Sequence, residues 1–240
     1  NDQILGGKGN DRINGEEGND FIDGGAGNDT IVDYYGFNTI KGGDGDDTIT
    51  GRGTFEGGRG NDVITASDTW LGDTYVFNLG DGKDTISDYG VSNALGYVGT
   101  GLNDTLKFGE GIDASAVTLA RNGNNLVFKI SETDQVAIKD WFSSGFYQIE
   151  TIQFADGSSW DLAKLKTMTP ETYSATDDDE TINGWDGIDK IQALGGNDNI
   201  NGYAGDDILD GGDGNDIISG GSGNDQILGG KGNDRINGEE

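Results

Sequence analysis

Acidic side chains that recur every nine residues are the groups in this sequence best suited to chemistry. An isoleucine or a leucine follows each of these positions by two residues, so charge and apolar character repeat together. The N-terminal series is Asp2, Asp11, Asp20, Asp29, Asn38 and Asp47. The C-terminal series is Glu180, Asp189, Asp198, Asp207, Asp216, Asp225 and Asp234. Carboxylate oxygens in such number favour the binding of hard divalent cations.

The composition excludes several other kinds of chemistry. The 240 residues include 45 glycines but no cysteine and no histidine, which excludes disulfide frameworks, zinc fingers, thiol nucleophiles and histidine-dependent triads. The net charge of −29 predicts that the chain binds neither nucleic acid nor anionic membranes. No run of about 18 apolar residues is present, so we expect no membrane insertion. We expect no enzymatic activity, although composition alone leaves a glycosidase with two carboxylates open.

Glycine-rich hexapeptides connect the apolar positions. Examples are GGKGND at 6–11, GGAGND at 24–29, GGDGDD at 42–47, GGDGND at 211–216 and GGSGND at 220–225. With this GGxGxDxUx pattern, in which U is a large apolar residue, the chain resembles the RTX (repeats-in-toxin) family of haemolysin-type calcium-binding repeats. The resemblance covers roughly residues 1–65 and 180–240. It implies an all-β fold made of parallel β-rolls, in which two nonapeptides complete one coil and equivalent loops stack.

Such stacking explains the need for a cation. Glycine permits positive φ angles and close backbone approach, and adjacent coils would lie about 4.8 Å apart. Two carboxylates at that separation repel each other by about 3.5 kcal/mol at an effective dielectric constant of 20. A Ca²⁺ ion between them reverses the sign of the interaction, and it accepts carboxylate and carbonyl oxygens at flexible geometry. We expect several Ca²⁺ ions, roughly seven or more, whose binding is coupled to folding.

The resemblance also implies which residues bind these ions. Each ion would lie between two stacked loops, held by both closing aspartates, by the second and fourth carbonyls of the earlier loop and by the first and third carbonyls of the later one. The implied carboxylate ligands are Asp2, Asp11, Asp20, Asp29, Asp47, Asp62, Asp189, Asp198, Asp207, Asp216, Asp225 and Asp234. The implied carbonyl ligands are Gly7, Gly9, Gly24, Gly25, Ala26, Gly27, Gly42, Asp44, Leu194, Gly196, Gly211, Gly212, Asp213, Gly214, Gly229 and Lys231.

Some positions depart from the pattern. Asn38 and its loop, DYYGFN at 33–38, lack the closing carboxylate and the paired glycines, which makes a site there doubtful. Glu180 is longer than Asp and is expected only to cap its array. The insertion GRGTFE moves Asp62 off the nine-residue spacing, and a role for Asp84 is left open. An EF-hand is excluded, because no Asp-x-Asp-x-Asp-Gly segment has Glu at its twelfth position.

The middle of the chain has a different pattern. Apolar residues alternate along it, which predicts short strands, and a short helix is expected near 161–167. Over roughly 104–165 the sequence resembles the haemolysin-type calcium-binding-protein-related domain, and this resemblance implies no catalysis. We expect Trp141, Trp160 and the neighbouring aromatic residues to form a small core, with a carbohydrate or partner platform as the alternative.

The predicted organisation consists of two rolls around a middle domain. Its boundaries are 1–65 for the first β-roll, 66–103 for degenerate repeats, 104–168 for the small mainly-β domain, 169–179 for a linker and 180–240 for the second roll. Residues 1–17 recur letter for letter as residues 224–240, at an offset of 223 residues. We interpret this recurrence as a window cut from a longer tandem protein, with an artefactual overlap as the alternative.

These features predict a calcium-binding structural module of a long, repetitive extracellular bacterial protein, such as an adhesin stalk or a surface filament subunit. The resemblance implies type I secretion, followed by folding on calcium outside the cell or at its surface. The expected partners are neighbouring copies of the same unit, in tandem or head to tail, and cell-surface glycans stay open. The alternative is a calcium-stabilised accessory or glycan-binding region of a secreted RTX enzyme or toxin.

Overall fold

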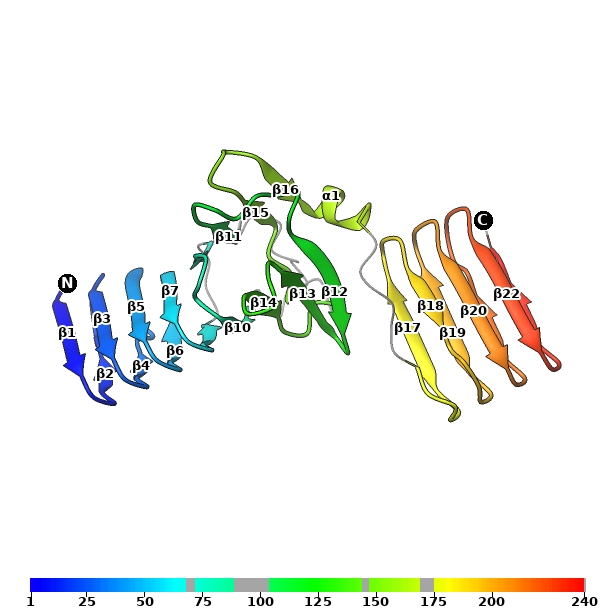
Figure 1. Cartoon of the computed structure of the whole chain (residues 1–240), viewed down its shortest axis with the longest axis horizontal. Helices are drawn as coiled ribbons and strands as arrows, with labels where there is room; N and C mark the ends of the chain where they lie inside the picture. The colour runs from blue at the N-terminus through cyan, green and yellow to red at the C-terminus, as the bar shows by residue number, and fades with distance from the viewer. Residues whose placement is uncertain (68–71, 89–103, 144–146, 169–174, 240) are drawn as a thin grey trace. The chain divides into compact units, whose positions relative to one another are not determined.

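The structure is a computed structural model. It describes residues 1–67, 72–88, 104–143, 147–168 and 175–239. Within these residues the regular elements are strands, apart from one short helix, α1 (Leu162–Lys166), so the predicted all-β class is confirmed (Figure 1). No helix of the described chain is long and apolar enough to cross a membrane.

The chain divides into two compact units, Asn1–Thr118 with Asn124–Asp161, and Leu119–Gly123 with Leu162–Glu240. The strands that precede residue 162 form two sheets, and the first twelve of them enter the two sheets alternately. The first sheet contains, in spatial order, β1 (Gln3–Lys8), β3 (Phe21–Ala26), β5 (Asn38–Asp44), β7 (Gly53–Arg59), β9 (Thr74–Phe77), β11 (Thr105–Phe108), β15 (Thr151–Gln153) and β16 (Ser159–Asp161). The second contains β12 (Thr118–Asn122), β13 (Asn125–Lys129), β14 (Gln135–Ile138), β10 (Lys83–Ser87), β8 (Val63–Ala66), β6 (Thr48–Gly51), β4 (Thr30–Val32) and β2 (Arg12–Asn14).

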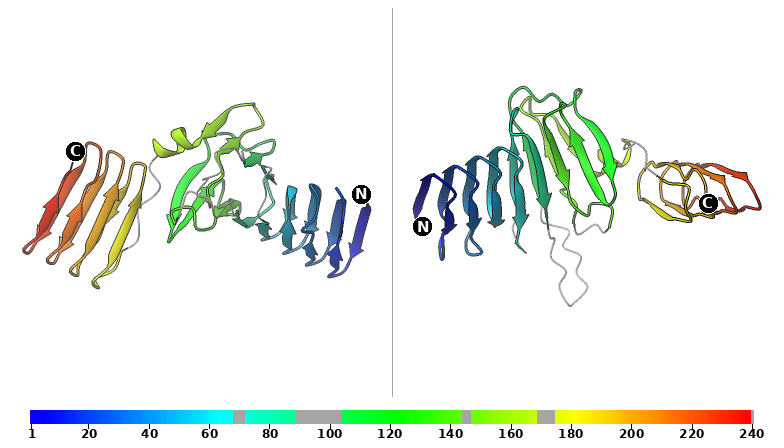
Figure 2. Two further views of the ribbon diagram at one scale, coloured as in Figure 1. Left: turned by 180° about the vertical axis from the view of Figure 1, so that it is seen from behind. Right: turned by 60° about the horizontal axis from the view of Figure 1, so that its bottom comes forward.

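The register of the first coils confirms the predicted parallel roll. Gln3 of β1 pairs with Phe21 of β3, one coil of 18 residues later, and the hydrogen bonds between coils repeat at the same separation. The strands of the first sheet extend into the loops: β1 and β3 have six residues each, because the glycine pairs of the loops continue the ladder. Figure 2 shows these coils stacked side by side.

The core consists of one inward-pointing side chain per strand. Ile22, Ile31, Ile40 and Ile49 are completely buried, because alternate residues of a strand point to the same face. Further along the first sheet, larger side chains take this position, beginning with Phe55 and followed by Tyr75, whose rings stack at 5.4 Å. The repeats therefore have a core of one apolar residue per strand, and this core contains larger side chains toward the middle of the chain.

The middle segment differs from the predicted separate domain. β11 and β15 continue the first sheet, and β14 continues the second, so the fold shows no boundary at residue 104. The physical reason is that an exposed strand edge leaves unpaired N–H and C=O groups, which these later strands cover. Two antiparallel pairs, β13 with β14 and β15 with β16, end the parallel stacking.

The aromatic residues of this segment form a core, as expected. Trp141 is completely buried, and Trp160 is 7% exposed and lies edge-on against Phe154 at 4.8 Å. Neither tryptophan can therefore contribute to an exposed platform. Helix α1 lies where a short helix was expected. Phe146 and Pro170, and parts of the predicted transition and linker, lie outside the described residues.

The second unit contains a regular roll. One sheet contains β17 (Thr181–Trp185), β19 (Asn199–Tyr203), β21 (Ile217–Ser219) and β23 (Arg235–Asn237). The other contains β18 (Lys190–Gln192), β20 (Ile208–Asp213) and β22 (Gln226–Lys231). Its central core cluster contains small and aliphatic side chains, and Trp185 of β17 is buried outside that cluster. The cluster consists of Ile182, Ile191, Ala193, Ile200, Leu209 and Ile218. Such a core buries little area, so each coil depends on its neighbours for stability.

Candidate metal centres

The closing aspartates of stacked loops form columns along each roll. The Asp11 backbone N–H donates to Asp29 Oδ1 at 2.7 Å, and the Asp29 N–H donates to Asp47 Oδ1 at 2.7 Å. The second unit repeats the contact between Asp198 and Asp216 at 2.9 Å. One carboxylate oxygen of each aspartate therefore belongs to the backbone framework, which holds these side chains in a row.

The second oxygen of these carboxylates has no hydrogen-bond partner. The orphaned, buried Oδ2 atoms of predicted ligands belong to Asp11, Asp20, Asp29, Asp47, Asp62, Asp198, Asp207, Asp216 and Asp225. A buried polar group without a partner costs about 1–3 kcal/mol, and a buried charge costs more. A row of such atoms therefore requires either protons or a cation.

The first glycine of each loop leaves the space that a cation would need. A Cβ atom on Gly24 would lie 2.6 Å from the carbonyl oxygen of Gly42 and would overlap Asp29 Oδ2. In the second unit, a Cβ on Gly211 would lie 2.7 Å from the Gly229 carbonyl oxygen and would overlap Asp216 Oδ2. The space thus lies between carboxylate and carbonyl oxygens, the donor set that Ca²⁺ prefers.

The second and fourth loop positions fix the turn. Gly7 and Gly9 have φ angles of +100° and +111°, which glycine adopts without strain. Leu194 and Tyr203 occupy the second position of two loops in the second unit with φ of 72° and 73°. Both side chains are exposed, so the backbone keeps the turn of the repeat without glycine there, at the cost of local strain.

The predicted carbonyls of the third loop position lie at the contact between coils. The Gly9 N–H donates to the Ala26 carbonyl at 2.7 Å, and the Gly214 N–H donates to the Lys231 carbonyl at 2.8 Å. Asp44 and Asp213 accept equivalent bonds from Gly27 and Gly196 at 2.8 and 3.0 Å. A carbonyl oxygen has two lone pairs, so each of these bonds leaves one available to a cation.

The structure brings the predicted carboxylates into four columns. The first unit contains one column with Asp2 and Asp20 and another with Asp11, Asp29, Asp47 and Asp62. The second unit contains Asp198, Asp216 and Asp234 in one column and Asp189, Asp207 and Asp225 in the other. Among the described residues, no three acidic side chains converge on one point. A bound cation would therefore also need carbonyl oxygens.

Two irregular positions join the columns despite their spacing. The Asp47 N–H donates to Asp62 Oδ1 at 2.8 Å across 15 residues, and the Asp62 N–H donates to Asp84 Oδ1 at 3.0 Å across 22 residues. The insertion therefore changes the length of a coil but not the column. Glu180 stands at the end of its column: its N–H donates to Asp198 Oδ1 at 2.8 Å, but its carboxylate accepts the Thr176 hydroxyl at 2.6 Å.

Burial changes the electrostatics of the columns. It raises the pKa of Asp62 to about 7 and that of Asp84 to about 8, and the charge of the neighbouring aspartates acts in the same direction. In the second unit, burial raises the pKa of Asp189 to about 7 and that of Asp207 to about 6. Without a cation, Asp84 therefore keeps its proton at pH 7, Asp62 and Asp189 keep theirs in part, and Asp207 loses most of its own. A cation must displace the protons that remain.

Further acidic residues continue one column beyond the repeats and were missed from the sequence. The Gly53 N–H donates to Asp73 Oδ1 at 2.6 Å, the Asp73 N–H donates to Asp104 Oδ1 at 2.6 Å, and the Asp104 N–H donates to Glu150 Oε2 at 2.9 Å. Their spacing of 31 and 46 residues hides them. The sequence nevertheless contains a local indication of their role: each of these acidic residues precedes an apolar residue by two positions, as in the repeats.

The fifth loop position is a second missed feature. Asn10 Oδ1 accepts the Asn28 backbone N–H at 3.0 Å, and Asn215 Oδ1 accepts the Asn233 N–H at 2.9 Å. These bonds run in the opposite direction to those of the closing aspartates. The near-constant Asn or Asp in GGxGND was visible in the sequence, and its function is to tie adjacent loops together at the surface.

Comparisons with known proteins agree with this geometry. The model of the RTX calcium-binding nonapeptide repeat (4 copies) matches residues 1–31, 34–54, 50–69, 174–209, 183–218 and 210–240. The model of the haemolysin-type calcium binding protein related domain matches residues 125–164. The chain is 34% identical over 108 residues to the iron-regulated protein FrpA of Neisseria meningitidis serogroup C, an alignment that covers 43% of this chain. It spans only 9% of the length of that protein.

Proposed function

Because the chain belongs to the family of RTX calcium-binding nonapeptide repeat proteins, we propose that its two rolls are structural modules of a long extracellular protein that become rigid on binding calcium. RTX repeats bind calcium, and proteins that carry them are typically secreted. The proposed module would cross the secretion system unfolded and would fold where free calcium is high. An adhesin stalk or a surface filament fits such a module.

The observation that carries this proposal is the row of orphaned carboxylate oxygens. Several candidate sites place an unpartnered Oδ2 beside a carbonyl oxygen, as for Asp29 and the Gly42 carbonyl. The chain also has a net charge of −29, and self-repulsion of that size opposes a compact state. Several divalent cations would remove both costs at once, which makes calcium a part of the folded structure.

Head-to-tail contact between copies would use the recurrent sequence. β22 has the sequence QILGGK, as β1 has, and β1 pairs in parallel with β3. A following copy could therefore present its own FIDGGA strand to β22 in the register that β1 and β3 already use. Neighbouring copies of the unit are thus the partners we propose.

An accessory region of a secreted RTX enzyme or toxin is the second candidate. It accounts for the calcium sites equally well, but it does not explain the recurrence of residues 1–17 at 224–240. Because Trp141 and Trp160 are buried, glycan binding by these tryptophans is not part of the proposal.

The test is a calcium titration of the whole 240-residue chain. We expect far-UV circular dichroism and small-angle scattering to change together from an expanded, disordered chain to a compact β-rich one as calcium rises. Magnesium at the same concentration is the control, and it should produce little folding because it retains its water. A chain that folds equally in calcium and in chelator would exclude the proposed function.

A further inference from the structure

The loop at residues 33–38 departs from the repeat at both of its ends. Asn38 stands where the other loops close with Asp, and Asp33 stands where they open with Gly. The matches to the repeat model end at residue 31 and resume at residue 34. Asp33 is therefore assigned to no repeat.

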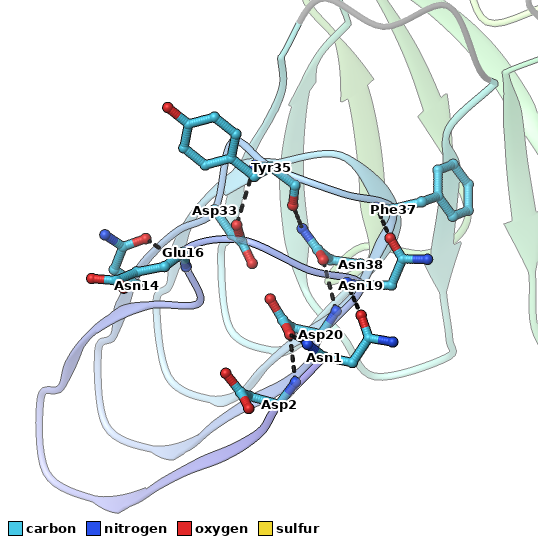
Figure 3. Close-up of polar contacts among 10 residues, drawn as sticks. All are labelled: Asn1, Asp2, Asn14, Glu16, Asn19, Asp20, Asp33, Tyr35, Phe37 and Asn38. Carbon is cyan, nitrogen blue, oxygen red and sulfur yellow. Dashed lines mark hydrogen bonds and ion pairs between the residues drawn. The ribbon is translucent and has the colours of Figure 1, made fainter.

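Asn38 preserves the framework of the column without its charge. Its Oδ1 accepts the Asp20 backbone N–H at 2.8 Å, as the aspartates do elsewhere, and its Nδ2 donates to the Tyr35 carbonyl at 2.9 Å. Both ends of the amide are thus used within the loop and column (Figure 3). The coil stacks normally, but position 38 supplies no negative charge for a cation.

Asp33 supplies a carboxylate in the same region. It is completely buried, its Oδ1 accepts the Tyr35 backbone N–H at 3.3 Å, and its Oδ2 has no hydrogen-bond partner. Asp20, which is 3% exposed, also has an orphaned Oδ2. A Cβ atom on Gly15 would lie 3.1 Å from Asp20 Oδ2 and would overlap Asp33 Oδ2. The two unpartnered oxygens therefore border one space beside Gly15.

We propose that a Ca²⁺ ion binds between loops 15–20 and 33–38, with Asp20 and Asp33 as its two carboxylate ligands. The carboxylate has moved from the sixth position of the later loop to the first, while Asn38 keeps the hydrogen bond of the sixth. This inference rests on the proposed calcium-dependent function and assigns a site that the repeat pattern leaves out. The site differs from its neighbours in the side chain that provides the second charge.

The other charges near this space do not replace the cation. The α-amino group of Asn1 lies 3.3 Å from Asp20 Oδ1, which is the other oxygen of that carboxylate. The charge of Asp20 and, more strongly, burial raise the pKa of Asp33, so a proton is the competing occupant. Counting the calcium ions bound by the chain distinguishes Ca²⁺ from a proton in this space.

The same placement recurs elsewhere in the first unit. Val32 aligns through Thr50 and Thr65 with Ser87, so Asp33 and Asp88 each follow the same strand position. Asp88 is 3% exposed and also has an orphaned Oδ2. A buried aspartate thus occupies this position in two coils of the first unit, whereas Gly51 and Ala66 occupy it in the two coils between them.

Native mass spectrometry of the whole chain with calcium tests the proposal, because it counts bound ions. If the wild-type chain binds n ions, Asp33→Asn should bind n − 1, and Asn38→Asp should still bind n, since its site is already filled. The matched control Asp46→Asn changes an exposed aspartate outside the columns and should bind n.

Two results would overturn the proposal. One is Asp33→Asn with n ions, which would make the proton the occupant of the space. The other is Asn38→Asp with n + 1 ions, which would mean that the wild-type loop is empty. The number of ions that Asn38→Asp binds tests the proposal even if Asp33→Asn fails to fold. A wild-type chain that binds no calcium would instead refute the proposed function.

Discussion

Asp189, Asp207 and Asp225 of the second unit stand 18 residues apart, whereas column steps in the first unit range from 15 to 46 residues. The contact is nevertheless the same, an N–H that donates to the next carboxylate at 2.5–3.1 Å. Coil length is therefore free to vary. What the column requires is an Asp, Glu or Asn two positions before an apolar residue of the strand, because that spacing places the side-chain oxygen at the start of the strand.

The two units also differ in what supports the columns. The second unit has a core of small and aliphatic residues, whereas the first adds an aromatic cluster in which Phe108 contacts Phe77, Phe128 and Phe154. Buried aromatic side chains contribute large apolar areas and favourable ring contacts. The regular unit should therefore depend on calcium more completely than the irregular one.

Calcium removal should give the largest effect and should separate the units. If free calcium is tenfold above Kd, each site contributes about 1.4 kcal/mol, so about eight sites contribute roughly 11 kcal/mol. We expect chelation at pH 7.5 to remove amide protection throughout β17–β23, while β11 and β13–β15 keep part of theirs. Hydrogen exchange measured by mass spectrometry, with and without chelator, checks this. Equal loss of amide protection in the two units would contradict the expected difference in their dependence on calcium.

The next largest effect should come from pH in calcium-free buffer. The pKa values of Asp47, Asp62 and Asp84 in the folded chain are raised to about 6, 7 and 8, above the unfolded value near 3.9. The folded state then holds more protons, so its stability falls as pH rises from about 5 to 8. Thermal unfolding of the calcium-free chain should show a higher Tm at pH 5 than at pH 8. A Tm that rises with pH would show that these carboxylates are charged when buried.

Asp216→Ala should affect two sites of the regular unit. Its Oδ1 holds the Asp198 N–H, and its own N–H donates to Asp234, so we expect a loss of about 3 kcal/mol and a calcium midpoint raised at least tenfold. Asp213→Ala is the control, since that side chain is 65% exposed and pairs only with Lys231. Circular dichroism during calcium titration measures both midpoints. Equal calcium midpoints for the two variants would show that the aspartate columns do not bind calcium.

A pair of glycine variants should give the smallest effects. In Gly24→Ala the methyl group enters the oxygen-lined space beside Asp29 Oδ2, so we expect a loss of about 2 kcal/mol and weaker calcium binding. Gly7→Ala meets no atom within 4 Å but has a φ of +100°, so about 1 kcal/mol of backbone strain is expected. Isothermal titration calorimetry should show reduced calcium affinity for Gly24→Ala alone. An unchanged affinity in Gly24→Ala would place the cation elsewhere.

Sequence reasoning predicted the parts of this fold that are local and periodic. The resemblance to RTX repeats implied the parallel coils and their stacked loops, and the nine-residue spacing of acidic and apolar residues identified the members of the isoleucine core and of the columns around Asp29 and Asp216. It could not predict Asp104, because that residue joins a column through a coil whose length depends on an insertion. It also placed a domain boundary at residue 104, since pairing of β11 with β9 is nonlocal and has no sequence period. Asp33 was overlooked because its importance depends on a neighbouring coil.

Thermal unfolding of the wild-type chain in calcium, in magnesium and in chelator at pH 7.5 tests the central claim most directly. We expect a cooperative transition in calcium that is lost, or shifted to a much lower temperature, in magnesium and in chelator. An equal Tm and an equal far-UV spectrum in all three would contradict it, because buried rows of carboxylates would then be stable without a divalent cation.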